Sequence, residues 1–96
     1  MKARRNSTAR NVFEDLGFAP PQAMNLQLRA TMMDILIAEI ENRGLTQARA
    51  AKVLGITQPR VSDLMRGKLH LFSIDTLVVL LSAMGLKVGF TIRKAA

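Results

Sequence analysis

Residues 45–67 read LTQARAAKVLGITQPRVSDLMRG, and this stretch contains the most specific structural signal in the chain. Its first half predicts a short helix over residues 47–54, because Thr46 can cap the first turn and Gly55 can end the last one. The small alanine side chains at 50–51 would let a neighbouring helix approach closely. We therefore expect this helix to pack against a second one in the same stretch.

The second half of the stretch predicts another helix, over residues 58–66. Thr57 can cap it, Gly67 ends it, and Pro59 falls in its first turn, where a missing N–H costs nothing. Two short helices joined by a glycine-containing turn form a helix-turn-helix. The apolar residues fit this arrangement, because they fall where the two helices face each other and the rest of the bundle: Ala51, Leu54, Ile56, Val61 and Leu64.

Further helices are predicted on both sides of this motif. Pro21 can sit in the first turn of a helix, and from Ala23 to about Arg43 apolar residues recur at helical spacing until Gly44 supplies a stop. After the motif, Ser73 can cap a helix over roughly residues 74–84. We expect nearly all of this helix to lie in the core.

Two segments of different composition precede the long helix. Residues 1–10 contain four basic residues and no acidic one, which predicts a flexible basic arm. The next segment, NVFEDLGFAPP at 11–21, can form a short turn of helix before two prolines break it. Its apolar residues are expected to fold back on the core: Val12, Phe13, Leu16 and Phe18.

The sequence period changes from helical to alternating in LKVGFTIR at residues 86–93. This alternation predicts one amphipathic strand, with Leu86, Val88, Phe90 and Ile92 on one face and Lys87, Gly89, Thr91 and Arg93 on the other. No other segment reads as a strand, so we expect its partner to be its own copy. The hypothesis is a two-fold dimer in which the two strands pair antiparallel and bury Val88, Phe90 and Ile92.

These elements predict an all-α fold with one C-terminal β-strand that pairs across a homodimer. A length of 96 residues allows one compact core of four or five helices and no second core. The chain is expected to consist of a basic arm (1–10), a helical helix-turn-helix domain (11–85), and a dimerisation strand with a tail (86–96).

The net charge of +7 and the pI near 11.2 favour polyanionic partners. Nucleic acid is the first candidate and an anionic membrane surface the second; a merely soluble basic protein is the alternative. No stretch approaches the roughly 18 apolar residues of a membrane span, and no apolar segment of signal-peptide length follows the basic N-terminus. We therefore expect a cytoplasmic protein that does not enter the membrane.

The residue inventory disfavours catalysis and metal binding. The chain has no cysteine, which excludes a disulfide scaffold and every cysteine-ligated metal site. His70 is the single histidine, so it has no cysteine to activate and no second histidine with which to share a metal. The sequence thus predicts no enzyme, no cofactor and no metal.

The outward face of the second motif helix is polar. The N-terminal end of such a helix usually enters the major groove, where a glutamine can pair with adenine through two hydrogen bonds. An ordinary solvated helix face is the alternative interpretation. The residues of this face are Gln58, Ser62 and Arg66 at i, i+4 and i+8, with Pro59 and Asp63 beside them.

Contacts with DNA can be assigned within this motif. The predicted base contacts are Thr57, Gln58, Arg60 and Asp63. Arg60 could pair with guanine or with a phosphate. Asp63 could accept a bond from cytosine or hold Arg60 or Arg66 in an ion pair, and we favour the ion pair. The predicted phosphate contacts are Gln47, Arg43, Lys52, Ser62, Arg66 and Lys68. Gln47 is also placed to form a hydrogen bond with the second motif helix, which we call the reading helix because it would contact the bases.

Over roughly residues 24–85, the chain resembles the Xre/Cro-type repressor family. The resemblance rests on GLTQ, the alanine pair, LGI, QPRVSDL and RGK. The flanking segments are more similar to the HigA-type antitoxins than to phage repressors. These segments are FSIDTL with a terminal strand and NVFEDLGF with a long first helix. The resemblance implies a lambda-repressor-like helical bundle, with base-reading positions at Thr57, Gln58, Pro59 and Asp63 and the phosphate-contact glutamine at Gln47. Many relatives have a polar residue where Pro59 stands, so an apolar contact, as with a thymine methyl, would replace direct readout there.

The function implied by this resemblance is a sequence-specific repressor. Such a homodimer binds a palindromic operator in double-stranded DNA, represses its own operon and, as an antitoxin, binds a RelE-like ribonuclease toxin. Two alternatives stay open: a stand-alone Xre-type regulator without a toxin, and a protein that is chiefly a toxin inhibitor. For the inhibitor, Phe13, Leu16 and Phe18 are candidate anchors, unless they pack on the chain's own core. RNA and membrane binding are disfavoured, because the four phenylalanines are scattered and form no stacking platform.

Overall fold

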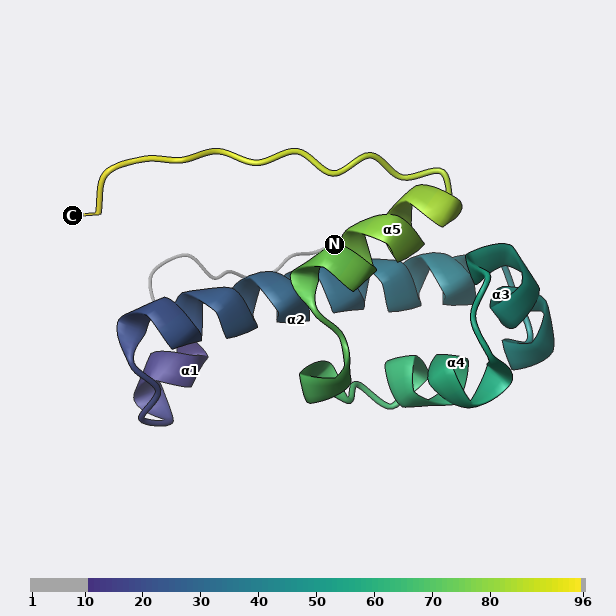
Figure 1. Cartoon of the computed structure of the whole chain (residues 1–96), viewed down its shortest axis with the longest axis horizontal. Helices are drawn as coiled ribbons and strands as arrows, with labels where there is room; N and C mark the ends of the chain where they lie inside the picture. Colours follow the sequence, from purple (N-terminus) through teal and green to yellow (C-terminus); the bar gives the residue numbers. More distant parts are fainter. Residues whose placement is uncertain (1–10, 96) are drawn as a thin grey trace.

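The computed structural model describes residues 11–95 (Figure 1), so the basic arm predicted for residues 1–10 lies outside the described part. All regular elements in this part are helical, which confirms the all-α class. None of these helices is long and apolar enough to cross a membrane. In chain order the elements are α1 (Val12–Asp15), α2 (Pro20–Asn42), α3 (Gln47–Leu54), α4 (Gln58–Met65), the 3-10 turn η1 (Leu69–Leu71) and α5 (Ile74–Ala83).

The long helix α2 is the element on which the others pack. It begins at Pro20, so Pro21 lies in the first turn as predicted, where the nitrogens of both prolines need not donate a hydrogen bond. In Figure 1, α1 lies beside the first turns of α2, while α5 and α4 lie on opposite sides of it. Helix α2 therefore lies between α4 and α5, while α3 lies at its C-terminal end and contacts both of them.

Three hydroxyl side chains begin the three helices that follow α2. Thr46, Thr57 and Ser73 each accept a hydrogen bond from the backbone N–H three residues later, at 3.1, 3.3 and 3.1 Å. Gly55 ends α3 in the left-handed conformation (φ 70°), which residues other than glycine rarely adopt. The predicted caps and the turn of the motif are thus confirmed.

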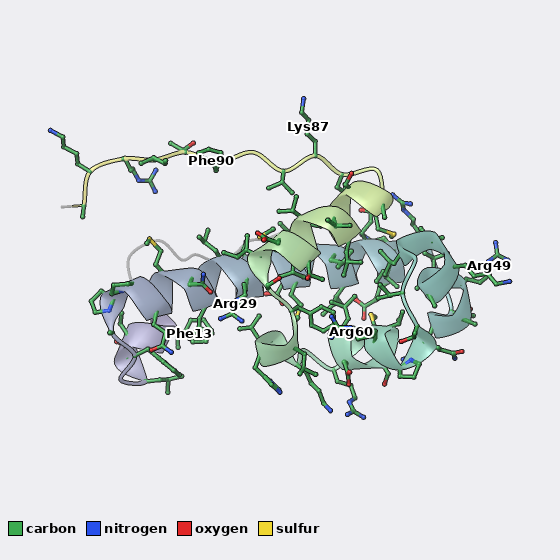
Figure 2. All side chains as sticks on the ribbon, in the orientation of Figure 1. Phe13, Arg29, Arg49, Arg60, Lys87 and Phe90 are labelled. Atoms are coloured by element: carbon green, nitrogen blue, oxygen red, sulfur yellow. The ribbon has the colours of Figure 1, made fainter. Side chains whose placement is uncertain are left out.

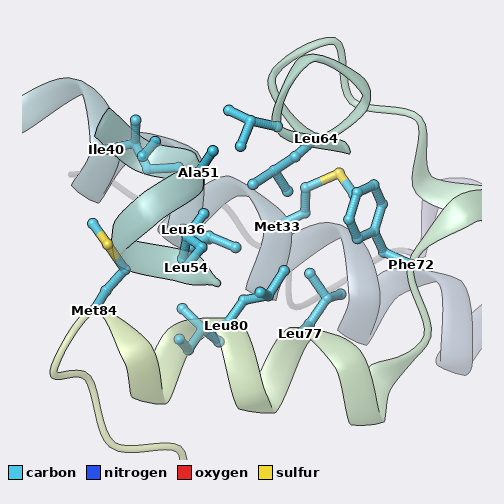
Figure 3. Packing of buried hydrophobic residues seen from close by; sticks show 13 residues of the cluster. Met33, Leu36, Ile40, Ala51, Leu54, Leu64, Phe72, Leu77, Leu80 and Met84 are labelled. Carbon is cyan, nitrogen blue, oxygen red and sulfur yellow. The ribbon is translucent and has the colours of Figure 1, made fainter. Parts of the chain in front are cut away.

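One apolar cluster holds these helices together (Figure 3). It confirms the packing predicted for the motif, since Ala51, Leu54, Val61 and Leu64 are buried and Ile56 packs against them partly buried. Burial of one such leucine contributes about 1.5 to 3 kcal/mol. The other buried members are Met33, Leu36 and Ile40 from α2, Ala50 from α3, Phe72, and Leu77, Leu80, Leu81 and Met84 in and after α5.

Helix α5 is less buried than its composition predicts. It ends at Ala83, close to the predicted end, and buries only the side that faces α2 and α3. Val78 is 37% exposed and Val79 64% exposed, so the prediction that nearly all of this helix is core is wrong for these two valines. Val78 lines a groove together with the beginning of the C-terminal segment, which covers this side of the helix only in part.

The C-terminal segment is extended but forms no strand in the single chain. After Leu86 it runs past α5 and α2 without pairing with another strand (Figure 1). No neighbouring extended segment among residues 11–95 is therefore available to form the backbone hydrogen bonds of a sheet. The predicted strand over 86–93 is therefore not formed here. Val88, Phe90 and Ile92, the residues predicted to be buried by pairing, are 41%, 86% and 84% exposed.

Candidate nucleic-acid interface

Helix α4 has one buried and one outward face. Val61 and Leu64 are fully buried against α2 and α3, which fixes the helix on its inner side. On the outer side, Gln58, Pro59 and Arg66 are exposed, as the sequence predicts. Packing against α2 and α3 therefore fixes the inner side of α4, while its polar side is exposed to solvent.

The first turn of α4 contains the two leading candidates for base contact. The Thr57 hydroxyl already accepts the backbone N–H of Arg60, so its hydrogen-bonding capacity is partly used inside the chain. The Gln58 side chain is exposed and makes no hydrogen bond within residues 11–95. Gln58 therefore retains both amide donors and its carbonyl acceptor for an external ligand.

Arg60 is held within the chain. Its Nη1 donates to the Leu71 carbonyl at 3.0 Å, and its Cζ lies 4.1 Å from the centre of the Phe72 ring. Figure 2 shows the side chain at the junction of α4 with the following turn. This guanidinium fastens α4 to η1, a contact that sequence reasoning missed because η1 was not predicted.

Asp63 forms an ion pair, but not with the predicted partners. Its carboxylate lies 3.5 Å from the Nζ of Lys68, so the predicted pair with Arg60 or Arg66 is wrong. The reason is the turn after α4: Gly67 adopts φ 70°, and the Lys68 N–H donates to the Asp63 carbonyl at 3.1 Å. This bond brings the two side chains together.

The predicted phosphate contacts divide into two groups. Gln47, Lys52 and Arg66 are exposed on α3 or just after α4, and Ser62 and Lys68 are half-buried beside them. Arg43 instead lies at the end of α2, where its Nε donates to the Glu39 carboxylate at 2.8 Å and its Nη2 donates to the Met84 carbonyl. Arg43 therefore ties α2 to the end of α5, through a partner that is too distant in sequence to be predicted locally.

The motif and its flanks are strongly basic. Residues 43–68 contain six basic residues and one acidic residue. One of these cations, Arg49 on α3, is exposed at the far end of the motif (Figure 2) and was not among the predicted contacts. The exposed positive charge around α3 and α4 is the electrostatic property expected of a surface that faces a polyanion.

The N-terminal helix α1 presents a separate apolar surface. Phe13 is half-buried and meets Phe18 edge to face, with ring centres 6.3 Å apart. Val12 is 54% exposed and Leu16 69% exposed, so the residues in and just after α1 that were predicted to fold back on the core do so only in part.

Within residues 11–95, no group of three or more His, Cys, Asp or Glu side chains lies close enough together to hold a metal ion.

Comparison with known proteins identifies the class of this fold. A family model described as a helix-turn-helix domain matches residues 12–93. A solved structure of a "Putative XRE Family Transcriptional Regulator" is 41% identical, with a TM-score of 0.73; the match covers 78% of this chain and 84% of that one. No curated protein is similar enough to count as a match. The chain therefore belongs to this helix-turn-helix family and is of the Xre type, a class of DNA-binding transcriptional regulators.

Proposed function

We propose that the chain is a sequence-specific repressor that binds a palindromic operator in double-stranded DNA as a homodimer. The observation that carries this proposal is the outer face of α4, where exposed Gln58 stands at the start of a helix whose inner face is fully buried. A helix supported in this way can enter the major groove without changing its orientation. Xre-type family membership supports the same function.

In the proposed complex, base readout centres on the first turn of α4. Gln58 pairs with an adenine, Thr57 contacts a neighbouring base, and Pro59 lies against a thymine methyl. Arg60 and Asp63 remain predicted contacts, but each has an internal partner that it must leave or share before reaching a base. Direct readout thus depends mainly on Gln58.

Phosphate contacts would orient this helix in the groove. Gln47, Lys52, Ser62, Arg66 and Lys68 surround α4 and supply hydrogen bonds or positive charge, which fix the register without reading sequence. Arg43 is the weakest of the predicted phosphate contacts, because its guanidinium already bonds Glu39 and the end of α5.

The dimer in this proposal forms through the C-terminal segment. Support comes from the exposed apolar side chains of Val88, Phe90 and Ile92, which alternate along an extended backbone. Removal of residues 86–96 should give a monomer in sedimentation velocity. A truncated chain that still sediments as a dimer would show that another surface holds the two copies together.

Selection from a random pool of double-stranded DNA, followed by footprinting, tests the proposal. We expect a palindrome whose half-site centres lie about 10 base pairs apart or a multiple of that, bound with a Kd on the order of 10⁻⁸ to 10⁻¹¹ M. Binding that is indifferent to sequence at physiological salt would contradict a repressor. A regulator of this kind acts in the cytoplasm, where operator DNA is found.

A second candidate function is that of a HigA-like antitoxin, which also binds a RelE-like ribonuclease toxin. The observation that favours it is the apolar surface formed by α1 and the turn after it, where Val12, Leu16 and Phe18 are 54%, 69% and 39% exposed. Exposed apolar side chains on a short helix can serve as anchors in a protein partner.

Co-purification with the product of the adjacent gene tests this second function. We expect a stable complex that Leu16→Ser weakens while operator binding stays unchanged. If the adjacent gene encodes no ribonuclease and its product does not bind, the protein is a stand-alone regulator.

A further inference from the structure

We infer that two copies pair their C-terminal segments in one register, with Gly89 of each chain opposite Gly89 of the other, and that the groove between α2 and α5 receives Phe90 of the second copy. This inference rests on the homodimer of the proposed function and adds two features to it: the register of the strands and the occupant of the groove.

The groove lies between α2, α5 and the beginning of the C-terminal segment, and its volume is about 610 Å³. Its walls are mostly apolar, and they are incompletely covered in the single chain: Leu28 and Ile35 of α2 are each 51% exposed, and Val78 of α5 is 37% exposed. Val88 and Phe90 line the groove as well, although 86% of Phe90 remains exposed. The chain's own segment therefore leaves part of this apolar surface in contact with solvent.

The backbone of the same segment lacks partners. Leu86 N–H donates to the Leu81 carbonyl at 3.0 Å, and from Lys87 to residue 95 no backbone group makes a hydrogen bond within the described part of the chain. An extended segment with alternating apolar side chains fits a second extended segment of the same pattern. A second copy supplies that pattern, and a two-fold axis makes the pairing antiparallel.

Symmetry limits the possible registers. In a two-fold antiparallel pair, the apolar side chains of both strands lie on the same side of the ribbon only when one residue stands directly opposite its own copy, at the axis. A slip of one residue would turn the apolar side chains of one strand to the other side. Of the possible axes, only those at Val88, Gly89 and Phe90 pair at least three of the four apolar residues of the segment with one another. An axis at Val88 would place Ile92 opposite Met84, which belongs to the end of α5 and cannot join a ladder.

Charge separates the two remaining registers. An axis at Phe90 places Lys87 directly opposite Arg93, and like charges in that position are destabilising. It also places Lys94 opposite Leu86. The register with the axis at Phe90 therefore puts cations both against each other and against the apolar face.

An axis at Gly89 avoids both conflicts. Val88 then lies opposite Phe90, Leu86 opposite Ile92, and Lys87 opposite Thr91. The two glycines meet on the outer side of the ribbon, where an added Cβ has no atom within 4 Å in the single chain. All four apolar residues of the segment thus have apolar neighbours across the dimer.

The hydrogen bond of Leu86 agrees with this pairing. Because its N–H is already used, Leu86 cannot belong to a hydrogen-bonded pair, so residues 87, 89 and 91 must form the bonds between the chains. The apolar pairs then occupy the narrow positions, where Cα atoms lie about 4.5 Å apart and side chains are closest. Since Val88 lines the groove, Phe90 of the second copy, which lies opposite it, is brought to the groove as well.

Single-cysteine variants test the register, because the chain has no cysteine of its own. The Cα atoms of a hydrogen-bonded pair lie about 5.5 Å apart, which suits a disulfide, so oxidised Gly89→Cys should run mainly as a crosslinked dimer. Val88→Cys alone and Phe90→Cys alone should crosslink little, because each lies diagonally from its own copy. An equimolar mixture of those two variants should crosslink. Arg49→Cys, exposed on α3, is the control for random collision.

The outcomes differ between registers. If Phe90→Cys crosslinks with itself better than Gly89→Cys does, the axis lies at Phe90 and the inference is overturned. If no variant in the segment crosslinks while the protein still sediments as a dimer, another surface forms the dimer and the inference is equally overturned.

A matched pair of lysine substitutions tests the groove. Val78 lines it, whereas Val79, the more exposed of the two, does not. Val78→Lys should raise the Kd of dimerisation at least tenfold, and Val79→Lys should leave it nearly unchanged; equal effects would remove Phe90 from the groove. Operator selection is measured separately, so a chain that crosslinks at Gly89 without selecting a DNA sequence would refute the proposed function and leave this inference standing.

Discussion

The polar side chains of α4 differ in how far their hydrogen-bonding groups are already used within the chain. Thr57 accepts the bond that begins the helix, Arg60 donates to Leu71, and Asp63 pairs with Lys68. Gln58 has no such partner among residues 11–95. Since a committed group gains less from an external ligand, we expect Gln58 to contribute most to discrimination between bases.

Gln58→Ala should weaken operator binding by about 1 to 3 kcal/mol and relax the preference at one base pair. Fluorescence anisotropy with operators substituted at single base pairs measures both effects. Lys52→Ala is the matched control, since loss of a phosphate contact should weaken binding to every operator alike. If the two variants behave identically, the reading face has been misassigned.

Arg60→Met should lower the stability of the fold by about 1 to 2 kcal/mol, because it removes a charged hydrogen bond and a cation–π contact while keeping the aliphatic stem. Thermal unfolding measures this loss. Arg66→Met is the control, because the Arg66 side chain is exposed and makes no hydrogen bond or ion pair within the described residues. A stable Arg60→Met that loses preference at one base pair would instead assign Arg60 to base readout.

At the scale of the helices, the features predicted from sequence are those that depend on residues close together in the chain. The caps at Thr46 and Thr57 and the stop at Gly55 are determined within a few positions, and the apolar spacing of the motif follows from helical periodicity. The exposure of Val79 and the bond from Arg43 to the end of α5 depend on how distant helices meet. Such contacts carry no local signal, so they could not be predicted.

Thr57→Ala should lower the free energy of unfolding by about 1 kcal/mol, because the first turn of α4 loses its side-chain acceptor. Urea denaturation measures this change. Thr57→Ser keeps the acceptor oxygen and should recover most of the stability. If serine proves as destabilising as alanine, the methyl group rather than the cap supports the helix.

At the scale of the whole molecule, the proposed dimer doubles a modest number of electrostatic contacts. Each copy places three cations beside its reading helix: Lys52, Arg66 and Lys68. One set of such contacts gives weak binding that salt readily abolishes, whereas two sets on one rigid dimer engage both half-sites together. In the proposed dimer, the C-terminal segment therefore raises operator affinity without contacting DNA.

The dependence of operator binding on salt tests this coupling. If all six cations of the dimer contact phosphates, the logarithm of the binding constant should fall with the logarithm of salt concentration with a slope of about −5, and a monomer should give about half that slope. A chain with both Val88 and Phe90 changed to serine keeps every charge but should no longer dimerise, so its slope at low protein concentration should approach the monomer value. Its reading helix is untouched, so each half-site should still be preferred over unrelated sequence, with much weaker affinity. An unchanged slope in this variant would mean that the two copies associate through another surface.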